Sequence, residues 1–263
     1  MFVKVASVLL LSIAGATAGG QTLRQISDCM IRPGTLCTGE NLRDLDLRGV
    51  DLSLSQFSRS DLSGADLRNS KWDGANLSRT LLVQANLQCA SLRDSDLGAA
   101  DLSRANLQDA KLDDAKLRDA VLNGADLTGA SLQGADLSTA ELRGALLQKA
   151  TLQNARLAGA DLSGASLKGA DLRGANLAGA VLVGADLTGA LLDQASFEGA
   201  STKGCIGCPR PSSPLPHRGR PPVDRCSDAA ASATASCAWD NASCARRSPP
   251  PGPRSRVQRP PPG

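Results

Sequence analysis

Leucine recurs at every fifth position along the middle of the chain, and this spacing dominates the pattern of apolar and polar residues. From Leu42 to Phe197 the fifth residue is always Leu, except at Phe57, Trp72 and Phe197, and no insertion interrupts the thirty-two units. The residue two positions before each centre is Ala in 24 of the units. The eight exceptions all fall in the first twelve units, so the series becomes more regular toward its C-terminal part.

A five-residue period fits neither of the two standard backbone conformations. On an α-helix, at about 100° per residue, successive leucines would step by about 140° and form no single face. On a flat strand an odd period would send successive leucines to opposite sides. A chain that turns a corner once per unit keeps Leu and Ala facing inward throughout, so the pattern predicts a β-solenoid. Gly, two residues after the centre in 15 units, suits such a corner.

Asp or Asn stands immediately before the centre in 16 units, as in Ala125-Asp126-Leu127-Thr128-Gly129. This A-[D/N]-L-x-x motif, sustained over about 160 residues, resembles the pentapeptide-repeat family. The resemblance implies an all-β fold, a right-handed quadrilateral β-helix with four units per coil, and therefore about eight coils over residues 41–200. At a sheet spacing of about 4.8 Å the coils would form a rod on the order of 38 Å long.

The first 18 residues have the three parts of an export signal. Lys4 gives the basic flank, residues 5–14 an apolar run and Ala16-Thr17-Ala18 a small-residue cleavage site. A membrane anchor is the alternative, but the run is too short to cross about 30 Å of hydrocarbon as a helix. We therefore expect a mature chain from about Gly19, secreted or periplasmic, with no membrane span after signal cleavage.

The repeat region and the C-terminal segment differ sharply in net charge and proline content. The net charge of +3 combines a repeat region 41–200 with 16 basic and 21 acidic residues and a segment 209–263 with nine Arg and three Asp. Thirteen of the 14 prolines lie in that last segment, which is predicted to be a disordered tail. A polyproline ligand or polyanion-binding arm is one interpretation of the tail, and a passive appendage is the favoured one.

The eight cysteines fit an oxidising compartment. Cys29 and Cys37 flank a turn in the predicted N-terminal cap 19–40, and we expect them to form a disulfide. Residues 22–30 of this cap are predicted to form a short helix that covers the first coil. Cys205 and Cys208 form a C-x-x-C in the closing segment 201–208, where a terminal disulfide or unpaired thiols are favoured over a redox or zinc site. The sequence leaves open the pairing of Cys89, Cys205, Cys208, Cys226, Cys237 and Cys244.

The repeat region lacks the residue combinations that catalysis requires. It contains many Ser residues but no His, because the single His217 lies in the tail, so a Ser-His triad is excluded there. Acidic pairs such as Asp113 and Asp114 arise from the repeat pattern and are expected to form a solvated face. No phosphate-binding loop motif occurs. We predict no catalytic residue, no cofactor and no metal site.

Folding the sequence at twenty residues per coil, as the resemblance implies, places several apolar side chains outward. Val181, Val183 and Leu191 near the last coil are predicted to form an association patch. The alternative is that these are scattered exposed apolar residues, which need no explanation.

The leading functional hypothesis is a non-enzymatic, exported structural or protein-interaction module that presents a rigid, rod-shaped surface. Its protein partner is not identified by the sequence, and a second copy forming a homodimer is one candidate. The alternative comes from the family, some of whose members mimic DNA and inhibit or protect a type II topoisomerase (gyrase). Export and the 16 interspersed basic groups count against this alternative. Nucleic acid is not expected as a partner. A redox enzyme using Cys205 and Cys208 is the least favoured class.

Overall fold

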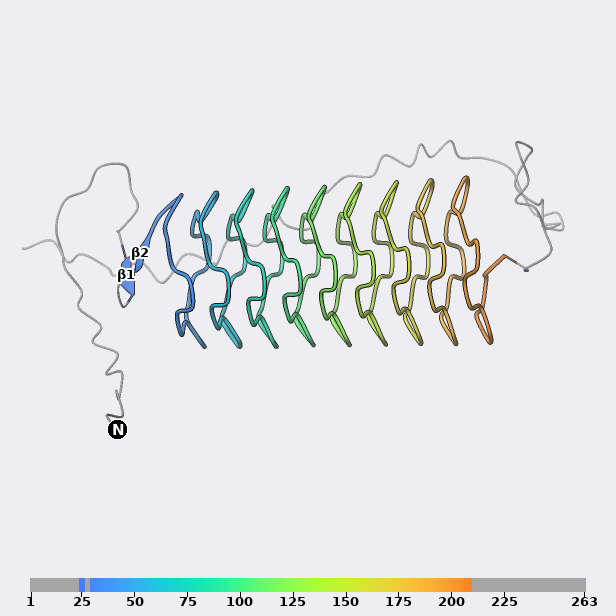
Figure 1. Cartoon of the computed structure of the whole chain (residues 1–263), viewed down its shortest axis with the longest axis horizontal. Helices are drawn as coiled ribbons and strands as arrows, with labels where there is room; N and C mark the ends of the chain where they lie inside the picture. Colours follow the sequence, from blue (N-terminus) through green and yellow to red (C-terminus); the bar gives the residue numbers. More distant parts are fainter. Residues whose placement is uncertain (1–23, 27–28, 210–263) are drawn as a thin grey trace, which may run out of the picture. The chain divides into compact units, whose positions relative to one another are not determined.

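The computed structural model describes residues 24–26 and 29–209 (Figure 1). The predicted export signal at residues 1–18 lies outside the described residues. So do residues 210–263, which make up all but the first residue of the predicted tail. The described residues thus comprise most of the cap, the repeat region and the closing segment.

The backbone returns to the same side of the molecule every twenty residues. Parallel β-bridges join each bridged residue to the residue twenty positions later, from the pair Leu36 and Gln56 to the pair Asp186 and Ile206. Four units therefore make one coil, and Figure 1 shows these coils following one another along the stack. The bridges form four ladders, which define face 1 (residues 41, 61 and so on to 201), face 2 (46 to 206), face 3 (51 to 191) and face 4 (36 to 196).

Backbone hydrogen bonds hold neighbouring coils together in the same way at nearly every unit. In the unit centred on Leu127, the Leu127 N–H donates to Leu146 O at 2.7 Å and the Gly129 N–H donates to Gln148 O at 2.9 Å. The Asp126 N–H donates in the opposite direction, to Ala105 O at 3.0 Å. Because these bonds pair the backbone groups beside the core, the coil interior can be largely apolar.

A tight turn forms each corner. From the centre Leu47 onward, the N–H three residues after the centre donates back to the carbonyl of the centre, as from Ala130 to Leu127 at 3.0 Å. The third residue of every such turn has a positive φ, for example 71° at Gly129. Seventeen non-glycine residues also adopt a positive φ, including Leu54 at 60° and Thr139 at 59°. A left-handed conformation costs such residues roughly 1–2 kcal/mol each, so the inter-coil ladder imposes this geometry on them.

The central leucines and the Ala residues that precede them by two positions form one continuous core along the stack. In the first coils the larger Phe57 and Trp72 are fully buried and pack edge to face, with ring centroids 5.0 Å apart. Where Ser or Thr replaces the inward Ala, its hydroxyl finds a backbone acceptor, as Thr80 Oγ1 does at Phe57 O at 2.9 Å. Within the described residues, no buried side-chain nitrogen or oxygen lacks a hydrogen-bond partner.

The N-terminal end of the stack is closed by a hairpin, and the helix expected at residues 22–30 is wrong. Strand β1 (Arg24–Ile26) pairs antiparallel with strand β2 (Cys29–Ile31). Cys29 and Ile31 are buried while Met30 between them is half-buried, which is the two-residue alternation of a strand lying on a core. This cap leaves the first centre, Leu42, fully buried.

The described part of the chain contains strands, single bridges and turns, and it contains no helix, in agreement with an all-β fold. Accordingly, the described residues include no helical segment with the length and apolarity of a membrane span.

The packing of the core yields a direct prediction for an inward leucine. Leu132 is fully buried, so Leu132→Ala should lower the free energy of unfolding by about 2–5 kcal/mol, because it removes apolar contacts and leaves a cavity. The matched control is the next residue, Gln133, which points outward, and Gln133→Ala should change the free energy by no more than about 0.5 kcal/mol. Urea denaturation of the two variants measures both values. Equal effects would contradict an inward leucine column.

Candidate interaction surface

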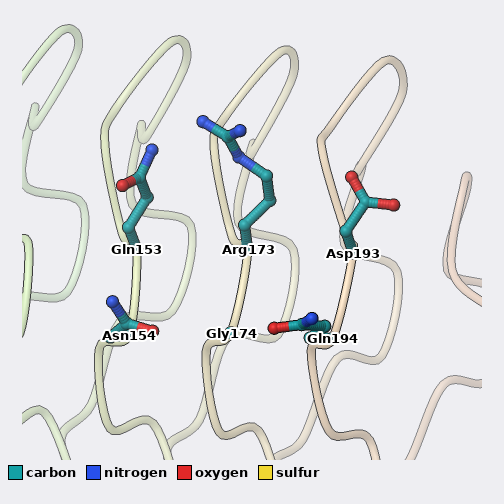
Figure 2. Close-up of a pocket in the computed structure, with 6 residues that line it drawn as sticks. All are labelled: Gln153, Asn154, Arg173, Gly174, Asp193 and Gln194. Atoms are coloured by element: carbon teal, nitrogen blue, oxygen red, sulfur yellow. The ribbon is translucent and has the colours of Figure 1, made fainter. Parts of the chain in front are cut away.

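A shallow polar hollow lies on face 3 across three successive coils near the C-terminal end (Figure 2). Figure 2 shows its side chains in two rows along the stack. The first row follows the centres of their units and consists of Gln153, Arg173 and Asp193, and the second row, at the corners, consists of Asn154, Gly174 and Gln194.

Asp171 is the best-anchored carboxylate beside this hollow. Arg173 binds it in a bidentate manner, with Nη2 to Oδ2 at 2.6 Å and Nε to Oδ1 at 2.9 Å, and the Arg173 backbone N–H also donates to Oδ1. From the coil before, Gln153 Nε2 donates to Oδ2 at 2.6 Å. The Arg173 side chain, aided by Gln153, lowers the pKa of Asp171 to about 2 in spite of the opposing effect of partial burial.

The Asp and Asn residues before the centres have a structural role that the sequence analysis missed. In all 16 units that carry one, its Oδ1 accepts a hydrogen bond of 2.9 to 3.3 Å from the backbone N–H two residues later. This bond caps the amide at the start of each corner, as in an Asx-turn. The two-residue spacing from the Asp or Asn to that amide was the signal that could have identified the role.

Other units obtain the same cap from the coil before. Arg93 and Arg143 lie in units that have Ser91 and Glu141 before the centre. Their backbone N–H groups donate to Asp73 Oδ1 at 3.0 Å and to Asn123 Oδ1 at 2.9 Å, respectively. In these two units a side chain of the preceding coil therefore takes the place of the Asp or Asn of the unit itself.

Much of the acidic surface follows from these caps. Eleven of the 21 acidic residues in 41–200 are capping Asp residues. Seven of the eleven also lie 2.6 to 3.9 Å from an Arg or Lys nitrogen. Such exposed pairs contribute little stability, but they neutralise charge locally. The faces therefore present short-range pairs of opposite charge.

The structure does not bring the three residues of the predicted association patch together. Val181 stands in the ladder of face 1, between Asp161 and Ser201, and Val183 follows in the same unit. Leu191 stands in the ladder of face 3, above Asp171, two corners further along the coil. Their exposed fractions are 40% for Val183 and 47% for Leu191, so they form two separate apolar spots on different faces.

The C-terminal end of the stack, unlike the N-terminal end, is not covered by further described residues. Leu192 and Phe197 are the inward residues of the last units, and both are only half-buried. Ile206, which ends the ladder of face 2, is 58% exposed. This end is the place where the core of the solenoid reaches the surface of the described structure.

Both cysteine pairs that flank the repeats lie within disulfide-bonding distance. The Cα atoms of Cys29 and Cys37 are 5.5 Å apart, and those of Cys205 and Cys208 are 5.7 Å apart. Cys29 and Cys37 are buried beneath the N-terminal cap, whereas Cys205 and Cys208 are at the open end. In the described ranges, no three His, Cys, Asp or Glu side chains are grouped to hold a metal ion.

These features match a known repeat family. Its sequence profile, described as pentapeptide repeats, matches residues 34–64, 60–98, 100–138, 140–179 and 170–205 in eight copies. The chain therefore belongs to the pentapeptide-repeat family, as the resemblance indicated. The comparison with curated protein sequences finds no match.

Solved structures of the same family are similar to this chain. One is HetL from the cyanobacterium Nostoc sp. strain PCC 7120, involved in heterocyst differentiation regulation, with 34% identity over 64% of this chain and 89% of HetL, at a TM-score of 0.30. Another is QnrB1, a plasmid-mediated fluoroquinolone resistance protein, with 24% identity over 63% and 90% of the two chains, at a TM-score of 0.46. A third, from the Arabidopsis thaliana thylakoid lumen, has 26% identity over 46% and 70%, at a TM-score of 0.19.

The contacts of Asp171 predict a dependence of stability on pH. A carboxylate whose pKa falls from about 3.9 in the unfolded chain to about 2 in the folded chain adds stability above pH 4 and loses it as the pH falls toward 2. The free energy of unfolding should therefore decrease between pH 4 and 2, and Asp171→Asn should make this decrease smaller. Glu198→Gln, at an exposed carboxylate with no hydrogen bond or ion pair among the described residues, is the matched control. Identical pH profiles for wild type and Asp171→Asn would contradict the assignment.

Proposed function

We propose that the chain is an exported, non-enzymatic interaction module that uses a rigid solenoid surface to bind another protein. In full, the proposed architecture is a right-handed quadrilateral β-helix of about eight coils followed by a disordered tail. The proposed location is secreted or periplasmic. A homodimer is the form that the proposal takes if the partner is a second copy.

The observation that carries the proposal is the contrast between the sides and the end of the stack. Along the sides, backbone groups pair between coils and Asp or Asn side chains cap the corner amides. At the C-terminal end, Leu192 and Phe197 are half-buried and Ile206 is exposed. An apolar core that reaches the surface at one end is a feature of surfaces that bind other proteins.

Two further observations support export and a binding role. The cysteine pairs at both ends of the repeats lie within bonding distance, which suits an oxidising compartment. Side chains in the polar hollow of face 3 are amides, a guanidinium and a carboxylate, which can form hydrogen bonds with a partner but include no nucleophile with a neighbouring base.

Mimicry of DNA is the less favoured function. A DNA mimic needs an extended row of unpaired negative charge that a positively charged protein surface can bind. Here the capping carboxylates are shared with Arg and Lys, as Asp161 is with Arg143 at 2.7 Å and Asp186 with Lys168 at 3.1 Å. These carboxylates also accept hydrogen bonds from the corner amides, so they do not form a row of unpaired negative charge.

Location in the native host separates these functions. We expect fractionation to recover the protein outside the cytoplasm, with N-terminal sequencing of the mature chain starting near Gly19, because residues 1–18 have the pattern of an export signal. The matched control is a variant with Lys4→Asp and Leu10→Asp, which should stay in the cytoplasm with its signal uncleaved. Recovery of the uncleaved wild type in the cytoplasm would contradict export, and protection of gyrase from quinolone-induced cleavage by that protein would favour the alternative.

A further inference from the structure

The C-terminal end of the stack is stepped. Counted in coils of twenty residues from residue 41, the ladders of faces 1 and 2 continue into a ninth coil, with Ser201 above Val181 and Ile206 above Asp186. The ladder of face 3 ends at Leu191, and the ladder of face 4 ends at Ser196. Half of a coil therefore has no counterpart above it in the described structure. We call this open half, above faces 3 and 4, the terminal slot.

The floor of the terminal slot is an unpaired strand edge. Within the described residues, the backbone N–H groups of Leu192, Gln194, Phe197 and Gly199 have no hydrogen-bond acceptor. The carbonyls of Ala190 and Ala195 likewise have no donor there. One coil earlier every equivalent group is paired, as the Leu172 N–H is with Leu191 O at 2.8 Å and the Leu177 N–H with Ser196 O at 2.7 Å. An edge of this kind is a template for an added strand.

The chain's own sequence cannot supply every hydrogen bond of the ladder in the same register. Each bridged residue donates its N–H to the residue 21 positions earlier, as Ile206 does to Ala185 O at 2.9 Å. The next two donors, to Ala190 O and Ala195 O, would have to come from positions 211 and 216. Both positions are proline, which has no N–H to donate. In this register the chain's own sequence therefore leaves the carbonyls of Ala190 and Ala195 without a donor, which a partner strand without proline at these positions would supply.

Charge and side-chain size define what the slot can bind. Leu192 and Phe197 line its floor and favour small or apolar side chains facing inward. Asp193 and Glu198 stand at its outer rim, and both are exposed. Arg173 of the coil before interacts electrostatically with Asp193, but neither carboxylate makes a direct ion pair with another described residue. A strand with Arg or Lys at its outward positions would therefore complement the rim.

We propose that the terminal slot binds an extended, basic segment of a partner protein, which completes the ninth coil as an added β-strand. This inference rests on the proposed interaction function and names the chemistry of the partner. A second copy of the chain is less suited to the slot because it brings the same acidic pair, Asp193 and Glu198. It also brings at least 54 residues that follow Pro209 at the same end.

Hydrogen exchange of the full-length protein tests the proposal. The probe is a ten-residue peptide, blocked at both ends, that repeats the unit Ala155–Gly159 twice and so has Leu at every fifth position and Arg outward. Saturating peptide should slow exchange at the amides of Leu192, Gln194, Phe197 and Gly199 by at least about ten-fold, because an added strand supplies their acceptors. The amide of Gly204 is the internal control, since it is unpaired among the described residues but lies on face 1, and its exchange should not change.

A charge exchange provides the second arm. Asp193→Lys combined with Glu198→Lys should weaken binding of this peptide at least about ten-fold, and a peptide with Glu in place of Arg should recover the affinity. The matched control is Asp94→Lys, at an exposed carboxylate on face 3 five coils away, which should leave the affinity unchanged.

Three outcomes would overturn the proposal. The first is a peptide that does not bind, and the second is one that protects amides outside the slot. The third is protection of the four slot amides without peptide that rises with protein concentration, because this would assign the slot to a second copy. The fractionation experiment is independent of all three, so a failure here leaves export and the interaction function to be judged separately.

Discussion

The structure depends on one constraint: the backbone must return alongside itself every twenty residues. The hydrogen bonds between neighbouring coils then join residues nineteen or twenty-one positions apart. The bond from the Leu127 N–H to Leu146 O and its equivalents satisfy this constraint at nearly every unit. Only a chain that turns four equal corners per coil can keep this register, so a positive φ is imposed even on Leu54 and Thr139. The leucine column then fills the interior at about 1.5–3 kcal/mol per buried side chain, against the conformational entropy lost on folding.

The period of five was sufficient to predict the inward positions, because neither a helix nor a flat strand can keep every fifth residue on one side. It could not reveal the Asx caps, since these depend on the direction of an amide two residues later, which only the corner geometry fixes. The hairpin at β1 and β2 lies outside the repeat and has no period to read, so a helix was expected there. The residues of the predicted association patch lie apart for a geometric reason: Val181 and Leu191 are ten residues apart, which places them two corners apart on separate ladders.

The same constraint links the fold to a binding role. Many of the acidic residues accept a hydrogen bond from a corner amide or pair with an Arg or Lys side chain. The sides of the stack therefore carry paired charges and capped amides. The ladder can stay unsatisfied only at an end. The hairpin closes the N-terminal end, while at the other end Pro211 and Pro216 have no N–H to donate to Ala190 O and Ala195 O in register. The terminal slot is thus a consequence of how a solenoid of this kind stops.

The most direct test of the twenty-residue return is the scalar coupling that NMR detects across a hydrogen bond. In the labelled protein, the amide nitrogen of Leu127 should couple to the carbonyl carbon of Leu146, the pair that lies 2.7 Å apart from N to O. Coupling of the Leu127 amide to a residue four positions earlier, as in a helix, or to a residue at any separation other than nineteen, would contradict the account.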